Sequence, residues 1–162
     1  MLFQEIDSKS NANLGSAFHV CEGDKLSYVF NIDNSSSAKT IGHFQKAKHC
    51  LDSEEYTDAK QHIDLAIALD PKCADHYCCR ADILIALYSG KLPLFLQKLG
   101  EILTDINDAL EIDPNHAEAI YMKGIVQYYF LDKEKEGLYQ IGKAASLGHI
   151  YAQVIYDELR DC

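Results

Sequence analysis

The stretch from Thr40 to Pro71 constrains the fold most, because it has the pattern of two amphipathic helices joined by a short turn. In each half, small and apolar residues recur at spacings of three and four, which places them along one side of a helix. Pro71 ends the second helix, since the residue before a proline avoids the helical conformation. In the turn, Asp52 and Glu55 predict a capping box. Helices joined by so short a turn must lie antiparallel. The two series are Ile41, Phe44, Ala47, Cys50 and Leu51, then Tyr56, Ala59, Ile63, Ala66, Ile67 and Leu69.

The end of this hairpin recurs farther along the chain, where residues 66–71 (AIALDP) are echoed by residues 109–114 (ALEIDP). This closing pattern resembles that of the tetratricopeptide repeat (TPR). Three further positions match the same family: Tyr56 and Ala59 at the start of the second helix, and Gly124 inside a later first helix. The resemblance extends from about residue 38 to the C-terminus and implies an all-α solenoid of about three helical hairpins. The TPR period is about 34 residues, whereas Pro71 and Pro114 are 43 positions apart. We expect the extra residues in a loop at 89–93.

The last unit has a second resemblance. Lys143-Ala144-Ala145, Gly148 and Ala152, with Tyr139 before them, resemble the Sel1-like repeat, a relative of TPR with the same helix pairing. Residues 150–159 then form a terminal helix that covers the open end of the stack, as repeat arrays require. At the start of this third unit, Asn115 is the expected N-cap.

Residues 1–37 differ from the repeats and form a separate N-terminal segment, with residues 38–162 as the repeat domain. Leu26, Tyr28, Phe30 and Ile32 alternate with other residues, a period of two that is typical of a strand. Gly23 lies in a turn-like stretch between this run and an earlier one, which favours a β-hairpin. A flexible tail or an extra helix is an equally good interpretation of the same residues.

Charge and hydropathy exclude several classes of protein. The formal net charge of −10 argues against a general nucleic-acid binder and against binding to anionic membranes, since both need cations. No apolar run approaches the length of a transmembrane helix, and the N-terminus lacks the pattern of a secretory signal. We therefore expect a cytoplasmic protein in a reducing compartment, unless it is exported without such a signal.

Six cysteines allow two interpretations. Cys73, His76, Cys78 and Cys79 are metal-ligand types at close range, but structural zinc sites usually pair two chelating couplets in turns. Consecutive residues on a helix diverge by roughly 100°, and free cysteine is commonly buried. Reduced, unliganded thiols are the favoured interpretation, and we expect no metal and no cofactor.

No catalytic motif is present: the sequence has no glycine-rich phosphate loop, nucleophile elbow or His-Glu-x-x-His. His43 and His62 are expected to be packing or surface residues. Asp105 and Asp108, which follow Glu101 on one predicted helix, have the pattern of a solvated face. An enzyme is the least favoured class.

The TPR resemblance implies a binding groove, because such arrays present a concave face lined mainly by their first helices. Its acids are interleaved with aromatics that would act as anchors, and only one position is a lysine, so an apolar or basic peptide or protein is the expected partner. The chaperone-binding subset of the family clamps a carboxylate with polar and basic groups at positions held here by Phe44 and Asp82, which disfavours that specificity. The implied groove residues are Phe44, Lys48 and Leu51 in the first repeat, Asp75, Cys78, Asp82 and Ile85 in the second, and Glu118, Tyr121, Ile125 and Tyr128 in the third.

Three functions are compatible with the sequence. The first is a non-catalytic protein-interaction module that binds its partner in the groove. The second is a dedicated small acidic inhibitor or chaperone, such as an immunity protein that neutralises a toxin or a secretion chaperone. The third is an enzyme or metal protein built around Cys73 to Cys79.

Overall fold

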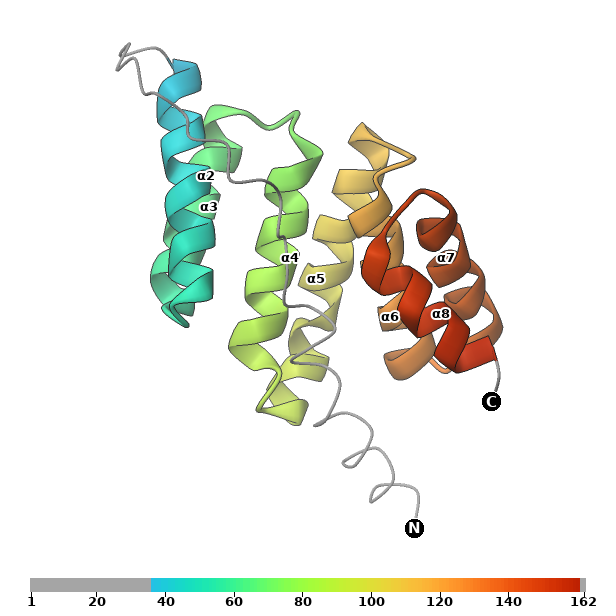
Figure 1. Cartoon of the computed structure of the whole chain (residues 1–162). Helices are drawn as coiled ribbons and strands as arrows, with labels where there is room; N and C mark the ends of the chain where they lie inside the picture. The colour runs from blue at the N-terminus through green and yellow to red at the C-terminus, as the bar shows by residue number, and fades with distance from the viewer. Residues whose placement is uncertain (1–35, 161–162) are drawn as a thin grey trace.

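The computed structural model describes residues 36–160, which form seven α-helices and contain no strand. The helices pair as consecutive antiparallel hairpins that stack side by side (Figure 1), so the expected all-α helical-hairpin solenoid is confirmed. The predicted N-terminal β-hairpin lies outside the described residues. None of the helices within 36–160 combines the length and apolarity that a membrane crossing requires. The hairpins are α2 (Ser36–Asp52) with α3 (Tyr56–Leu69), α4 (Ala74–Tyr88) with α5 (Leu92–Ile112), and α6 (Ala117–Phe130) with α7 (Glu134–Ser146), and α8 (Ile150–Arg160) follows.

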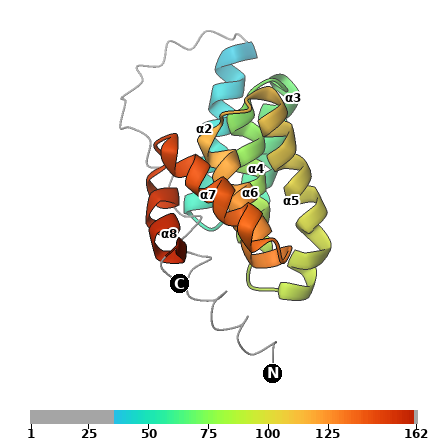
Figure 2. The same cartoon turned by 90° about the vertical axis from the view of Figure 1, so that its right-hand side faces the viewer.

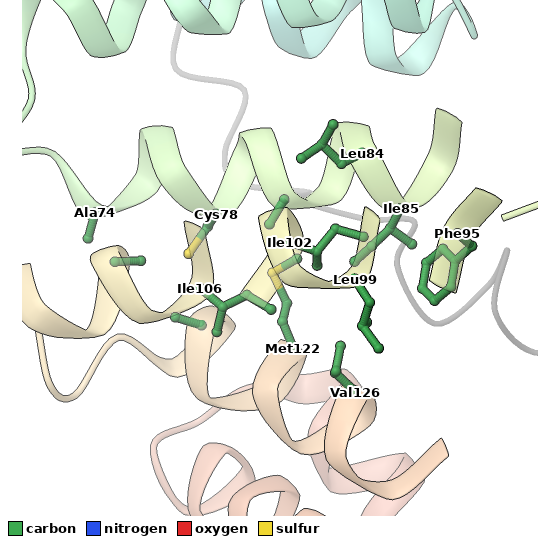
Figure 3. Packing of buried hydrophobic residues seen from close by; sticks show 13 residues of the cluster. Ala74, Cys78, Leu84, Ile85, Phe95, Leu99, Ile102, Ile106, Met122 and Val126 are labelled. Carbon is green, nitrogen blue, oxygen red and sulfur yellow. The ribbon is translucent and has the colours of Figure 1, made fainter. Parts of the chain in front are cut away.

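The first helices α4 and α6 are buried on two sides, which is why their sequences are apolar nearly all round. Ile83 of α4 packs into a cluster with α2 and α3, whereas the adjacent Leu84 and Ile85 pack toward α5 and α6. Helix α6 is similar, with Met122 facing α4 and α5 and Ile120 facing α7 and α8. Each hairpin therefore buries its neighbour's apolar side, as in other repeat proteins. Figure 3 shows the central cluster, formed by residues of α4, α5 and α6.

Small residues set the distances between paired helices. Ala59 and Ala66, which face α2 in the first hairpin, have no exposed surface. At the crossing of α6 and α7, a Cβ atom on Gly124 would lie 2.8 Å from Ile141 Cγ1, and one on Gly137 would lie 2.6 Å from the Tyr128 backbone nitrogen. Both distances are shorter than real Cβ contacts, so this crossing depends on glycine. Gly148, with φ +90°, ends the turn before α8.

Helix α8 does not extend the stack of second helices. It lies on the same side as the first helices, across α6 (Figures 1 and 2), and Ala152 of α8 is buried in one cluster with Tyr121 and Ile125 of α6. The predicted terminal helix is therefore present. It packs against α7, where Tyr156 of α8 lies against Gly142, and also contacts α6 on the first-helix side. The Sel1-like nature of α7 and α8 stays a prediction.

Local signals were less accurate than the pattern of helices. Glu55 precedes α3 without any side-chain cap, and Asp52 ends α2, so the predicted capping box is wrong. His116, not Asn115, caps α6 with its side chain. The extra residues of the middle unit are helical rather than a loop, because α5 begins at Leu92 and runs for 21 residues against 14 in α3.

The prediction of a solvated face for Asp105 is also wrong. Its side chain is 4% exposed and makes a bidentate ion pair with Arg80 of α4, at 2.6 Å and 3.0 Å. Arg80 also reaches Asp64 of α3 at 3.1 Å, so one guanidinium joins three helices. Burial raises the pKa of Asp105 and the guanidinium opposes that rise, while the pair raises the pKa of Arg80. The exposed neighbour expected in this run, Glu101, pairs with Lys98.

Candidate functional site

The predicted groove residues divide into a buried set and a partly exposed set. Those of the buried set have at most 9% of their surface exposed, so they hold the first helices together and offer a ligand little surface. Those of the partly exposed set lie on α2, α4 and α6. The buried residues are Leu51, Cys78, Ile85, Tyr121 and Ile125, and the others are Phe44, Lys48, Asp75, Asp82, Glu118 and Tyr128.

Phe44 and Lys48 of α2 lie next to the start of α4. The Phe44 ring lies 5.0 Å from the ring of the buried His76, centroid to centroid, and the Lys48 ammonium lies 5.7 Å from the Phe44 centroid. Lys48 also lowers the pKa of both Asp75 and Asp82 on α4, although in each case it is a minor influence. The structure thus brings the aromatic ring and the single predicted cation to the same region as the two acids.

Asp82 lies in the middle of α4, between α2 and α6. Burial, followed by the negative charges of Glu118 and Asp52, raises its pKa to about 8. Its side chain is nevertheless partly exposed, and no hydrogen bond or ion pair joins its carboxylate to another residue within 36–160. An acid in this setting is costly to ionise, and a cation placed beside it would remove most of that cost.

Asp75 and Glu118 each pair with a histidine that caps the next helix. His116 Nδ1 accepts from the Ala119 N–H at 3.3 Å at the start of α6, and its Nε2 donates to Asp75 at 2.9 Å. His149 repeats this arrangement at the start of α8, with its Nδ1 3.0 Å from the Ala152 nitrogen and its Nε2 2.7 Å from Glu118. The hydrogen bond from His116 lowers the pKa of Asp75, and that to Asp75 raises the pKa of His116.

The two histidines were not among the predicted site residues, although the sequence contains a signal for them. Each stands directly before a first-helix-side helix and three positions before the alanine whose N–H it caps, in His116–Ala119 and His149–Ala152. Histidine is not among the favoured N-cap residues, so neither position was recognised by residue type. The repeated His-x-x-Ala spacing at equivalent places would have indicated a shared role.

Tyr121 is covered by α8. Its ring stacks on the His149 imidazole with centroids 4.4 Å apart, and only 1% of its surface is exposed. Burial raises the pKa of Tyr121. Tyr128 retains some exposure but packs edge-on against Tyr129, and its backbone and Cβ abut Gly137 of α7. Of the three predicted aromatic anchors, Tyr121 is buried, whereas Phe44 is partly exposed in the region of Asp75 and Asp82.

A thiol, an imidazole and a carboxylate are aligned between α4 and α6. Cys78 Sγ lies 3.5 Å from Nδ1 of His116, and Nε2 of the same imidazole contacts Asp75. This is the order of groups in a cysteine hydrolase. However, Cys78 is 5% exposed within the central cluster (Figure 3), and the same Nδ1 already accepts the Ala119 N–H. The arrangement is therefore that of a buried thiol hydrogen-bonded to a helix cap.

Metal ligands do not gather around the cysteines. Within residues 36–160, no three His, Cys, Asp or Glu side chains are grouped so that they could hold an ion. The four cysteines of that range, Cys50, Cys73, Cys78 and Cys79, form no disulfide bond there. The pKa of the Cys50 thiol and that of the Cys73 thiol are both raised, and burial is the largest cause in each case.

Comparison with solved structures identifies the fold. The TPR domain of Arabidopsis OM64 superposes with a TM-score of 0.63 at 21% identity, covering 78% of this chain and 98% of that domain. The first TPR of Spaghetti (RPAP3), bound to the HSP90 peptide SRMEEVD, gives 0.61 at 17%, covering 78% and 94%. The TPR2B domain of yeast Sti1, in its complex with pHsp70, gives a TM-score of 0.60 at 19% identity, covering 76% and 97%. No family model matches the chain, and no curated protein matches it significantly in sequence.

Proposed function

We propose that this protein, whose fold is that of a TPR domain, is a non-catalytic module that binds a peptide or protein segment carrying cationic and apolar side chains. The segment lies on the face formed by α2, α4 and α6. The observation that carries this proposal is the Asp82 carboxylate, which is partly exposed and joined to no other described residue by a hydrogen bond or an ion pair. One solved TPR domain of this fold is bound to a peptide and another is in a complex with pHsp70, which supports a role in binding a peptide or protein segment.

The chemistry around Asp82 favours a cation. Asp52 and Glu118 add to the negative field at its carboxylate, and Lys48 offsets that field only weakly. A lysine, an arginine or an amino terminus of the partner would neutralise this field. Phe44 offers a partly exposed aromatic surface close by, and aromatic rings are common anchors at interfaces.

The same charges disfavour an acidic ligand. The HSP90 peptide bound to RPAP3, SRMEEVD, ends in acidic groups. On this chain such a terminus would face Glu118 and Asp52, the carboxylates whose negative charges already raise the pKa of Asp82. Like charges brought together at an interface cost several kcal/mol. We infer that the specificity of this module is of opposite sign. The binding unit in this proposal is the repeat domain, residues 38–162, and residues 1–37 are a separate segment.

A selection experiment tests the proposed function. Random peptides displayed on phage are selected on the full-length protein, and the enriched sequences are measured by fluorescence polarisation. We expect enriched peptides to combine Lys or Arg with apolar residues, to bind more weakly as salt rises, and to bind Asp82→Asn about tenfold more weakly than wild type. A labelled SRMEEVD peptide should not bind.

The matched control is Glu111→Gln, which removes one negative charge from the exposed surface of α5. It should bind the selected peptides like wild type, because α5 is a second helix remote from the proposed face. Peptides without a cation, or equal affinity of the Asp82 and Glu111 variants, would contradict the proposal.

A further inference from the structure

Two histidines face one another between α2 and α3 of the first hairpin. His43 of α2 and His62 of α3 have their Nδ1 atoms 3.2 Å apart, with ring centroids at 5.4 Å and planes inclined by 33°. Both side chains are partly exposed. The contact is a hydrogen bond in which one imidazole donates and the other accepts, and solvent can reach it.

The two rings are suited to binding a metal ion because their Nδ1 atoms face one another and both side chains are partly exposed. A neutral imidazole has one nitrogen lone pair free for coordination, and neutral histidine is the commonest metal ligand in proteins. In the metal-free protein, one Nδ1 carries a proton and donates it in the hydrogen bond, and the lone pair of the other Nδ1 accepts it.

The separation of the nitrogens also fits. With Zn–N bonds of about 2.0–2.1 Å and tetrahedral angles, two imidazole nitrogens on one zinc ion lie about 3.3 Å apart. The observed Nδ1–Nδ1 distance of 3.2 Å therefore matches this spacing, and a rotation of each ring by roughly 40° away from the N–H···N line directs both lone pairs at a common ion.

We propose that His43 and His62 form a bis-histidine site for a divalent cation that prefers nitrogen ligands, such as Zn²⁺ or Cu²⁺. On binding, both Nδ1 atoms coordinate the ion, which replaces the N–H···N hydrogen bond. Each ring then carries its single proton on Nε2. The ring that donated the hydrogen bond therefore moves its proton from Nδ1 to Nε2, and no proton is released. Water completes the coordination, since no third ligand of the metal-binding types lies close among the described residues. Cu²⁺ should bind more tightly than Zn²⁺, following the general order for such sites.

The ion would fasten α2 to α3. His43 is on the helix that carries Phe44 and Lys48, and His62 is on its antiparallel partner, so one ion joined to both fixes the hairpin at the N-terminal end of the stack. Because a ligand that binds only the folded state stabilises it, the thermal midpoint should rise with the concentration of Zn²⁺.

Calorimetric titration of the full-length protein with Zn²⁺ tests this site, using His43→Gln, His62→Gln and His49→Gln. His49 is an exposed histidine of the same helix whose imidazole contacts only Ser53 among the described residues, which makes it a matched control. We expect wild type and the His49 variant to bind an equivalent of Zn²⁺ that each of the other variants binds at least tenfold more weakly. Mg²⁺, which requires oxygen ligands, should not bind.

A second measurement covers the case in which a variant fails to fold. In wild-type protein, Zn²⁺ should shift the imidazole NMR signals of His43 and His62 together and leave that of His49 in place. Undiminished Zn²⁺ binding by both folded variants, loss of the equivalent in the His49 variant, or unshifted His43 and His62 signals would each overturn the proposal.

Discussion

His116 Nε2 lies 2.9 Å from Asp75 Oδ1, so the imidazole that caps α6 is bonded to the first turn of α4 one repeat earlier. The same relationship joins His149 to Glu118 between α8 and α6. A carboxylate at the second position of one first helix thus orients the cap of the next helix on that side. This recurring bond links successive repeats in addition to their apolar packing.

The Asp75–His116 pair predicts a pH-dependent stability. The pKa of His116 is raised, so its contribution is complete below about pH 6.5 and is lost as pH rises through its folded pKa. The pKa of Asp75 is lowered, so its contribution is present above about pH 4 and is lost on further acidification. The Asp75 side chain is 64% exposed, which limits the effect to that of a surface pair, roughly 0.2–1 kcal/mol.

We therefore expect Asp75→Asn to lower the free energy of unfolding at about pH 5.5 and to have less effect at about pH 9, as measured by urea denaturation. An equal loss at both pH values would show that the charge of the pair does not contribute. The exposed Glu111→Gln variant serves as the control for removal of one negative charge.

The helices could be predicted from the sequence because the apolar spacing and the repeated Asp-Pro ending are local properties. The span of α3 follows directly from Tyr56 to Leu69, and the buried Ala59 and Ala66 follow from their periodicity. The ion pair between Arg80 and Asp105 could not be predicted in this way. A charged residue on a helix is recognised as buried only when its partner on another helix is known.

The exposure of the predicted groove residues was predicted less well than the fold, for a tertiary reason. Tyr121 stands at a position that TPR arrays turn toward the groove, but α8 folds back across α6 and places His149 on its ring. Nothing in the local sequence of α6 indicates that contact. Asp75, Asp82 and Glu118 were correctly placed on first helices, and their role in binding stays a prediction.

Tyr121 should behave as a core residue. We expect Tyr121→Ala to lower the free energy of unfolding by about 3–5 kcal/mol, the usual cost of removing a buried aromatic ring. Tyr139→Ala, at a tyrosine with 69% of its surface exposed, is the matched control and should stay within about 0.5 kcal/mol of wild type. Similar small effects for both variants in denaturant titrations would mean that α8 does not cover Tyr121 in solution.

The crossing of α6 and α7 should not tolerate a methyl group on Gly137. Its Cβ would meet the Tyr128 backbone at 2.6 Å and the Gly124 carbonyl oxygen at 2.8 Å, so Gly137→Ala forces the helices apart, and we expect a loss of about 1–3 kcal/mol. At Gly100, inside α5, an added Cβ has nothing within 4 Å. Gly100→Ala should instead stabilise the protein by about 0.5–1 kcal/mol, and thermal unfolding of the two variants should therefore shift in opposite directions.

Ala66 should be sensitive to larger side chains in the same way. It has no exposed surface between α2 and α3, whereas Ala68 on the same helix is exposed. We expect Ala66→Leu to cost about 1–3 kcal/mol through overpacking, and Ala68→Leu to change stability by less than about 0.5 kcal/mol. Equal effects in urea denaturation would mean that the faces of α3 are assigned wrongly.

Ionisation of Asp82 should lower the free energy of unfolding, whereas ionisation of Asp75 should raise it. Its folded pKa is about 8, far above the unfolded value near 3.9, so between these values the folded state binds more protons than the unfolded state. The free energy of unfolding then falls as pH rises from about 4 to about 8 and is level above that. Asp82→Asn cannot ionise, so it should remove this slope and stabilise the protein at about pH 9, where each pKa unit of the shift corresponds to about 1.4 kcal/mol.

Ionisation of Asp82 should also govern binding. A cationic peptide binds the charged carboxylate better than the protonated one, so its affinity for wild type should rise between about pH 7 and pH 9 as Asp82 loses its proton. The Asp82→Asn variant should bind weakly over the whole range and lack this rise, while Glu111→Gln should follow wild type. Fluorescence polarisation at constant ionic strength separates this effect from salt screening. A pH profile unchanged by Asp82→Asn would show that the cation of the partner lies beside a different group.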